Sequence, residues 1–169
     1  MLKIRPHRAA GPAAPERSAE RSPNEAPAEP SNVNLTRRAT FAAAHVLRRE
    51  DWPEEKNREV FGACAGDHGH NYVIEVSVSG SVDPQTGMVI NLRSLDAIIR
   101  RAIIEHVDHR HLNRDVIFLA GVVPTAENLA LAFWAQLDAL LTTPGPGGGS
   151  RLERLRLIES ENNSVEVTR

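Results

Sequence analysis

The stretch CAGDHGH, residues 64–70, brings a cysteine and two histidines close together in the chain. Cys64 is the only cysteine of the sequence, so it is either an inert small residue or a thiol kept for its chemistry. His68 and His70 lie two residues apart at the start of an alternating apolar segment. In a strand, that spacing places both side chains on one face, about 7 Å apart at their Cα atoms. Both imidazoles can then reach one metal ion.

A third histidine, His45, can join this pair. It ends residues 36–45, where alternation places Phe41 and His45 on one face and predicts a β-strand. Antiparallel pairing of the two predicted strands brings the end of the first beside the start of the second. Three neutral imidazoles with an open fourth position are typical of a catalytic zinc site, whereas structural zinc sites are closed. The alternative is that the histidines belong to a surface turn or are hydrogen-bonded core residues.

The role of Cys64 depends on the segment that precedes it. Residues 46–67 are predicted to form a long charged loop. If that loop folds back onto the histidines, a nearby cation favours the thiolate, which is the basic and nucleophilic form of cysteine. If it does not, Cys64 is a buried small residue without a chemical role.

Two carboxylates elsewhere in the chain could also take part in catalysis or binding. Asp108 precedes His109 in VDHRHLN, and an aspartate that accepts from an imidazole N–H supports proton transfer near neutral pH. The alternative is a polar helix end, with His106 favourable near the negative helix terminus. Glu159, in LIESENN, is either a solvated turn acid or a buried carboxylate that recognises a flat ring with adjacent N–H donors.

The elements around these residues are expected in the order ββααββ. The clearest strand covers residues 68–80, and DPQTG then forms a turn before a short extended piece, MVINL. A helix with one apolar face is predicted from a cap at Asn91 to about residue 106. A second helix is predicted to begin at PTAEN, where Thr125 can cap it and the negative charge of Glu127 is favourable near the positive end of the helix dipole. The stretch TTPGPGGG is predicted to end this helix. Two short strands flank the turn ESENNS.

This order predicts an α+β fold, with two helices on one face of an antiparallel sheet. Such a small sheet leaves its two edges open, and open edges favour association of subunits through strand pairing into a larger barrel. The α+β domain is expected to occupy residues 32–169. Residues 1–31 hold six of the eleven prolines and are predicted to be a disordered tail.

Composition excludes several functions. A net charge of −2 argues against a nucleic-acid partner. The sequence has no run of about 18 apolar residues, which a membrane-spanning helix would need. The first 30 residues lack the apolar middle of a secretory signal. An organellar presequence is the alternative, but such segments avoid acids and this one has four glutamates. We therefore expect a cytoplasmic protein.

Taken together, the motifs FAAAH, CAGDHGHNY, VDPQTGMVINLRSLD, VDHRHLN, PTAENLA and ESENNSVEV give the chain a specific resemblance. It resembles the 6-pyruvoyl-tetrahydropterin synthase and 6-carboxy-tetrahydropterin synthase family over roughly residues 36–168. The resemblance implies a T-fold, in which trimeric barrels stack in pairs into a homohexamer with active sites at subunit boundaries. It also implies a pterin substrate, 7,8-dihydroneopterin triphosphate.

The resemblance implies a role for each site residue. His45, His68 and His70 match the ligands of Zn²⁺. Cys64 matches the base that removes a substrate proton, and Asp108 with His109 matches the pair that completes proton transfer. Glu159 matches the acid that anchors the pterin, and Thr125 and Glu127 lie in a motif near the pterin pocket. Arg48, Arg49 and Lys56 are candidates for contact with the triphosphate.

The spacing in CAGDHGH bears on the product. The pyruvoyl-forming enzymes typically place five residues between the cysteine and the first histidine, whereas this chain has three, Ala65 to Asp67. The shorter gap resembles the carboxy-forming enzymes of queuosine synthesis, which release acetaldehyde and triphosphate. We therefore expect a carboxy-forming lyase, with a pyruvoyl-forming synthase as the alternative. A non-catalytic pterin- or purine-binding protein and a structural zinc protein are further alternatives.

Overall fold

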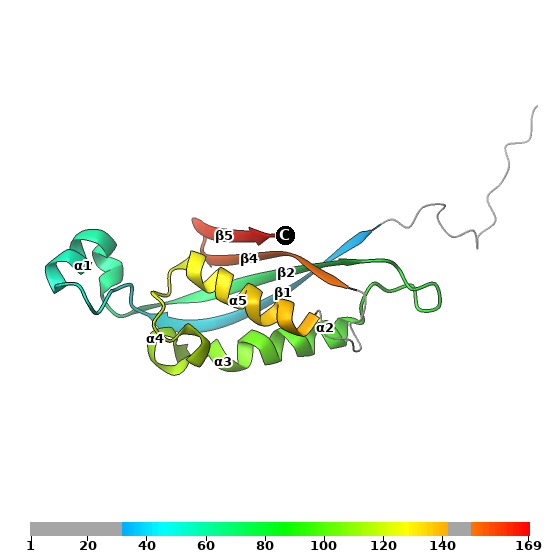
Figure 1. Cartoon of the computed structure of the whole chain (residues 1–169), viewed down its shortest axis with the longest axis horizontal. Helices are drawn as coiled ribbons and strands as arrows, with labels where there is room; N and C mark the ends of the chain where they lie inside the picture. Colours follow the sequence, from blue (N-terminus) through cyan, green and yellow to red (C-terminus); the bar gives the residue numbers. More distant parts are fainter. Residues whose placement is uncertain (1–31, 142–149) are drawn as a thin grey trace, which may run out of the picture.

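A computed structural model describes residues 32–141 and 150–169 of the chain (Figure 1). The predicted tail, residues 1–31, lies outside the described residues, as does the helix-ending stretch TTPGPGGG. Within the described part, strands form one sheet with the order β3-β1-β2-β4-β5. The strands are β1 (Val33–His45), β2 (His68–Gly80), β3 (Arg110–His111), β4 (Arg151–Ser160) and β5 (Asn163–Thr168).

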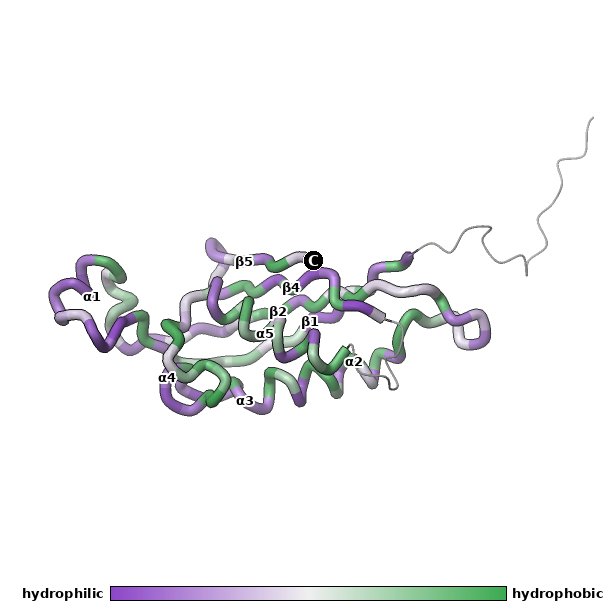
Figure 2. The backbone as a smooth tube through the Cα atoms, viewed as in Figure 1, coloured by the Kyte–Doolittle hydropathy of each residue, from purple (hydrophilic) through white to green (hydrophobic). Residues whose placement is uncertain are grey.

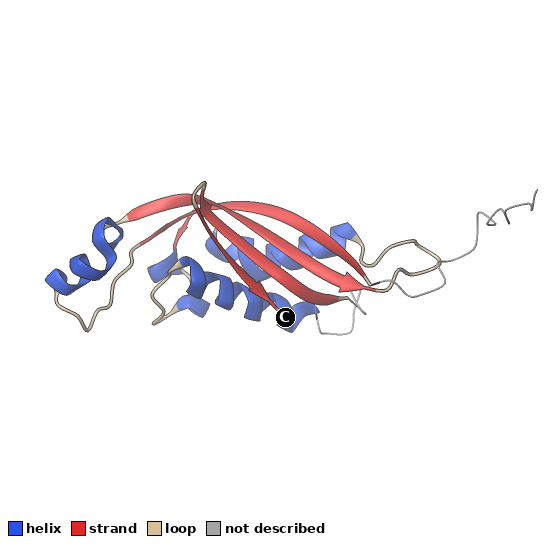
Figure 3. Cartoon of the chain, turned by 90° about the horizontal axis from the view of Figure 1, so that it is seen from above, coloured by secondary structure: helices blue, strands red, loops and turns tan. Residues whose placement is uncertain are grey.

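The helices all pack on one face of this sheet, apart from α1 (Glu54–Phe61), which projects beyond its end (Figures 1 and 3). The α+β prediction is therefore confirmed. The sheet is mixed rather than purely antiparallel, because the short β3 runs parallel to β1. A two-residue strand has no periodicity of its own, so the sequence pattern gave no sign of β3.

The β1–β2 pairing aligns the histidines that the sequence singled out. The register pairs His45 with His68, Ala43 with His70, and Phe41 with Tyr72. All of these side chains leave the sheet on the face that the helices cover, where Phe41 stacks on Tyr72 with ring centroids 4.8 Å apart. The same alternation that builds the core therefore brings the histidines to one face at the end of the two strands.

Two helical rods complete the core. The first runs from α2 (Leu92–Ile99) through a π-helical turn (Arg100–Ile104) into α3 (Glu105–Val107), and hydrophobic and hydrophilic residues alternate along it (Figure 2). The short α4 (Leu112–Asp115) and a 3-10 turn (Ile117–Leu119) follow, and then α5 (Ala126–Leu141). Both predicted caps are present: Asn91 Oδ1 accepts from Arg93 N at 2.9 Å, and Thr125 Oγ1 accepts from Asn128 N at 3.3 Å.

The structure corrects two local predictions. Residues 46–67 are not a plain loop, because they contain α1 and a 3-10 helix (Gly62–Ala65). The charged α1 has no apolar stripe that periodicity could detect. Instead, the fully buried Asn57 fixes it by accepting from Arg49 N at 2.8 Å and donating to Arg49 O at 2.9 Å. The short extended piece expected at residues 88–92 is not a strand.

Among the described residues, no helix has the length and apolar character to cross a membrane.

Candidate active site

Three histidine side chains meet at the end of β1 and β2. One ring nitrogen from each of His45, His68 and His70 lies within 4.8 Å of the others, and the ring centroid of His45 is 4.4 Å from that of His68 and 5.2 Å from that of His70. His45 is 1% exposed, whereas the other two are partly accessible. The predicted convergence is therefore present, and its donor set fits a divalent metal ion that keeps a free coordination position.

Backbone carbonyls turn two of these rings toward the common point. The Nδ1–H of His45 donates to the Pro124 carbonyl at 2.9 Å, and the Nδ1–H of His68 donates to the Gly66 carbonyl at 2.8 Å. A carbonyl only accepts, so the proton lies on Nδ1 and the lone pair of Nε2 is left for a metal. Burial lowers the pKa of His45, which favours the neutral ring that binds metals.

Glu159 belongs to the same cluster. Its Oε1 lies 3.8 Å from His45 Nε2 and 3.9 Å from His70 Nε2, and it accepts from the Tyr72 hydroxyl at 3.3 Å. Asn163 Nδ2 donates to the other carboxylate oxygen at 2.6 Å. By two-residue alternation, Glu159 lies on the same face of the sheet as Tyr72. Its side chain is therefore held at the metal site rather than in a solvated turn.

Tyr72 is a site residue that the sequence reasoning missed as such. Its fully buried hydroxyl lies between Glu159 and the His45 ring, 3.5 Å from either ring nitrogen. Burial, and then the negative charge of Glu159, raise the pKa of Tyr72, so the hydroxyl stays protonated and donates. The available signal was its position two residues after His70 on the histidine face of the strand.

The segment that carries Cys64 folds back onto the site. The backbone N–H of Leu47, two residues after His45, donates to the Cys64 carbonyl at 2.8 Å. The thiol is half-buried, and it is near enough that its charge would contribute to raising the pKa of Tyr72. Cys64 therefore lies in a segment that is bonded back to the chain two residues after His45.

Asp108 and His109 form a pair on the opposite edge of β1. Asp108 Oδ1 accepts from Ala42 N at 3.0 Å and lies 3.0 Å from His109 Nδ1. The Ala42 N–H first, and then the His109 ring, hold the pKa of Asp108 below its usual range. His109 adopts a left-handed φ of 57° and donates its N–H to the Ala42 carbonyl at 2.7 Å. Its side chain is 83% exposed, so the pair faces outward.

The PTAEN motif acts on the site through its backbone. Thr125 caps α5, and the preceding Pro124 supplies the carbonyl that orients His45. Glu127 is exposed in the first turn of α5. The sequence singled out Thr125 and Glu127 but not Pro124, because a carbonyl acceptor leaves no trace in residue type.

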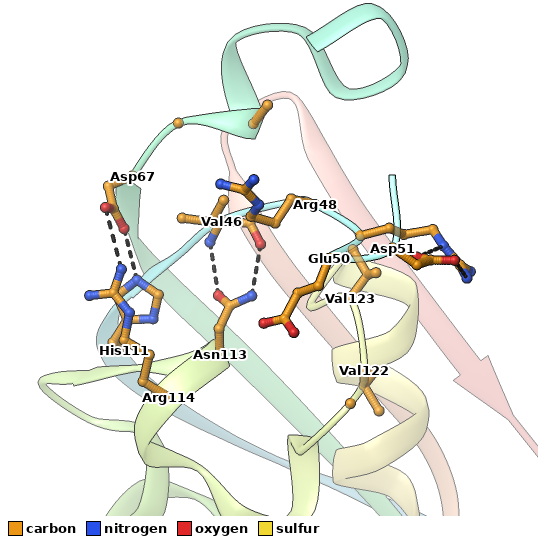
Figure 4. Close-up of a pocket in the computed structure, with 14 residues that line it drawn as sticks. Val46, Arg48, Glu50, Asp51, Asp67, His111, Asn113, Arg114, Val122 and Val123 are labelled. Carbon is orange, nitrogen blue, oxygen red and sulfur yellow. Dashed lines mark hydrogen bonds and ion pairs between the residues drawn. The ribbon is translucent and has the colours of Figure 1, made fainter. Parts of the chain in front are cut away.

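A cavity of about 850 Å³ adjoins the cluster where the 46–67 segment faces α4 and residues 121–123 (Figure 4). Arg48 and Arg49 line it, but each pairs with an acid: Arg48 with Glu54 at 3.1 Å, and Arg49 with Asp51 at 2.8 Å. Lys56 is not among the lining residues and lies over the Trp52 ring, 4.0 Å from its centroid. The three candidates for triphosphate contact are thus engaged within their own segment.

An α+β sheet with helices on one face and, at its end, three histidines that could hold a metal ion define a protein of the T-fold class. The family model for 6-pyruvoyl tetrahydropterin synthase matches residues 34–169, so the chain belongs to this enzyme family. It is similar to a solved structure of the 6-pyruvoyl tetrahydropterin synthase of Caenorhabditis elegans, with 33% identity and a TM-score of 0.73 over 82% of this chain and 96% of that one.

Two further relatives differ in their named product. The 6-pyruvoyl tetrahydrobiopterin synthase of Dictyostelium discoideum is 38% identical over 133 residues, which are 79% of this chain and 93% of that protein. An Archaeoglobus fulgidus protein, named provisionally as a 6-carboxy-5,6,7,8-tetrahydropterin synthase, is 29% identical over 130 residues, 77% of this chain and 90% of that protein. The expectation of a carboxy-forming enzyme is thus less well supported than its pyruvoyl-forming alternative, because a three-residue spacing weighs less than similarity along the whole domain.

Proposed function

We propose that this chain is a zinc-dependent lyase that converts 7,8-dihydroneopterin triphosphate to 6-pyruvoyl-tetrahydropterin with loss of triphosphate. The observation that carries the proposal is the convergence of three imidazoles, a thiol segment and the Glu159 carboxylate at one end of the sheet. The greater similarity to the Dictyostelium synthase supports the pyruvoyl product.

Each residue of the site has a part that follows from its chemistry. His45, His68 and His70 would hold the ion, since three neutral nitrogens with an open position suit catalytic zinc. Zinc bound there would polarise the hydroxyls of the substrate side chain. Glu159 would accept from adjacent N–H groups of the pterin ring, because its carboxylate is fixed by Tyr72 and Asn163 before substrate arrives.

Proton transfer would be shared between Cys64 and the Asp108–His109 pair. Cys64 as thiolate would remove a proton from side-chain carbon. The pair lies outward on the other edge of β1, so we propose that it serves a site completed by another subunit. The open edge of β5 is a further reason to propose an oligomer, a hexamer built from two trimeric barrels. No redox cofactor is needed, because protons move within the substrate as triphosphate leaves.

A carboxy-forming reaction is the second candidate, and the gap of three residues between Cys64 and His68 favours it. The deciding experiment incubates zinc-loaded protein with 7,8-dihydroneopterin triphosphate and identifies the pterin by mass. Pyruvoyl-tetrahydropterin without acetaldehyde supports the proposal. Carboxy-tetrahydropterin with stoichiometric acetaldehyde supports the second candidate and a place in 7-deazapurine synthesis.

The matched control for this assay is Cys64→Ala. It should abolish turnover and leave the zinc content unchanged, because the thiol is not counted among the ligands. No turnover by the zinc-loaded parent protein would contradict both candidates.

A further inference from the structure

The 46–67 segment has a narrow base at the end of the sheet. It leaves the sheet after His45, rejoins it at His68, and carries Cys64 near its returning end. The Leu47 N–H bonded to the Cys64 carbonyl at 2.8 Å holds the two ends together. The position of the thiol therefore depends on what fixes this base.

Asn113, in α4, holds the departing end. Its Oδ1 accepts from the Val46 N–H and its Nδ2 donates to the Val46 carbonyl, both at 2.9 Å (Figure 4). Val46 is buried, so its backbone groups need partners within the protein. One amide satisfies both groups, as a neighbouring strand would, and this fixes the first residue after His45.

His111, two residues before Asn113, holds the returning end. Its Nε2 lies 2.9 Å from Asp67 Oδ1, and because a carboxylate only accepts, Nε2–H is the donor (Figure 4). Arg114 Nη2 lies 3.5 Å from the other oxygen of Asp67. The His111 side chain is only 14% exposed, and its Nδ1 is buried without a hydrogen-bond partner among the described residues. The bond to Asp67 offsets this cost of keeping the ring in place.

The connection from Cys64 to His68 is short enough to transmit any displacement. Only Ala65, Gly66 and Asp67 separate the two residues, and the Gly66 carbonyl orients the His68 ring. A shift of Asp67 therefore moves the thiol relative to the three imidazoles.

We propose that His111 and Asn113 are positioning residues for Cys64, a brace that holds both ends of the 46–67 segment and so fixes the position of the thiol relative to the histidine cluster. Neither residue needs to touch substrate. The proposal deepens the proposed function and rests on it only for its effect on turnover.

The test uses His111→Phe and Asn113→Ala in the zinc-loaded, full-length protein. We expect kcat to fall about 10- to 100-fold with little change in KM, since displaced catalytic groups lose that much rate. We also expect iodoacetamide to alkylate Cys64 several-fold faster, and zinc content is measured in parallel because the Gly66 carbonyl of the same segment orients His68. Asn113→Asp, which keeps the acceptor for Val46 N and loses the donor, should give an intermediate effect. If Asn113→Ala does not fold, Asn113→Asp replaces it in the test.

The matched control is Asp96→Asn, which breaks the Arg37–Asp96 ion pair farther back along β1 and should leave turnover and alkylation unchanged. Alkylation needs no substrate, so failure of the brace and failure of the proposed function are distinguishable. If folded brace variants keep the parent rate of alkylation, the proposal is overturned whatever the protein catalyses. If the rate of alkylation changes but turnover does not, the position of Cys64 does not affect catalysis and the proposal also fails.

Discussion

Replacing Gly69 with alanine should damage the histidine site without touching a histidine. A Cβ on Gly69 would lie 2.9 Å from the Ala43 carbonyl oxygen and 3.4 Å from Ala44 Cα, and both neighbours are backbone. Since ordinary contacts of a Cβ begin at 3.4 Å, β1 and β2 must separate by about half an ångström. Overpacking of this kind costs about 1–3 kcal/mol, which lowers the melting temperature of a chain of this length by about 2–12 °C.

The cost should appear in metal binding as well, because Gly69 lies between His68 and His70. The assay is thermal unfolding of the zinc-loaded and the metal-free protein, together with zinc affinity by competition with a chelator. We expect Gly69→Ala to unfold at lower temperature in both forms and to bind zinc more weakly. The loss should be larger in the zinc-loaded form, where ligand displacement adds to overpacking.

Gly66→Ala is the matched control. Its Cβ would meet only the Ala63 carbonyl oxygen at 3.5 Å, an ordinary contact, and its φ of −94° suits any residue. Both replacements remove the same backbone freedom from the unfolded chain, worth about 0.4–1 kcal/mol, so the difference between them isolates the clash. A Gly69→Ala protein as stable as Gly66→Ala, with parental zinc affinity, would refute the reasoning.

Three further predictions concern the site itself. His45→Ala should lose bound zinc after desalting, measured by atomic emission, while circular dichroism still reports a folded sheet, because catalytic sites are emptied before the fold is lost. Tyr72→Phe should keep zinc but lose about tenfold in kcat/KM, since Glu159 loses a charge-assisted hydrogen bond of roughly 1.5–3 kcal/mol. Asp108→Asn should be less stable than the parent at neutral pH. The folded pKa of Asp108 lies below its usual 3.8, chiefly because of the Ala42 N–H, so its contribution is complete above about pH 4 and disappears as pH falls through the lower folded value. Urea unfolding across this range measures it.

Each of these predictions has an outcome that contradicts it. His106→Ala, at an exposed histidine outside the cluster, is the control for zinc loss, and zinc retained by His45→Ala would remove that residue from the ligand set. An unchanged KM and kcat in Tyr72→Phe would mean that Glu159 does not depend on the hydroxyl. A stability difference for Asp108→Asn that stays constant from neutral to strongly acidic solution would show that its ionised form contributes nothing.

The sequence predicted the parts of this fold that local patterns encode. Two-residue alternation placed His45, Phe41 and Tyr72 on one face of two strands, because the face of a strand side chain follows from its parity alone. The caps at Asn91 and Thr125 were also predictable, since an N-cap depends on the residue and the few positions after it.

Other features escaped prediction because they depend on contacts between distant residues. The α1 helix forms around a buried polar side chain, Asn57, rather than on an apolar stripe. The short β3 is a strand only because β1 lies beside it. The sequence left open whether Glu159 is a turn acid or a site residue, and the pairing of β4 with β2, which brings Glu159 beside Tyr72, decided it.

By itself, the sequence determined which residues can do chemistry here: three histidines on strand faces, one thiol, and a carboxylate near the end of the chain. Only the tertiary structure decided that they meet. The β1–β2 register pairs His45 with His68, and the hydrogen bond to the Pro124 carbonyl fixes the tautomer of His45. Hydrogen bonds from Asn113 and His111 hold the segment that carries the thiol against the end of the sheet. The physical reason is that residue type and periodicity act over a few positions, whereas each of these contacts joins backbone or side-chain groups that are far apart along the chain.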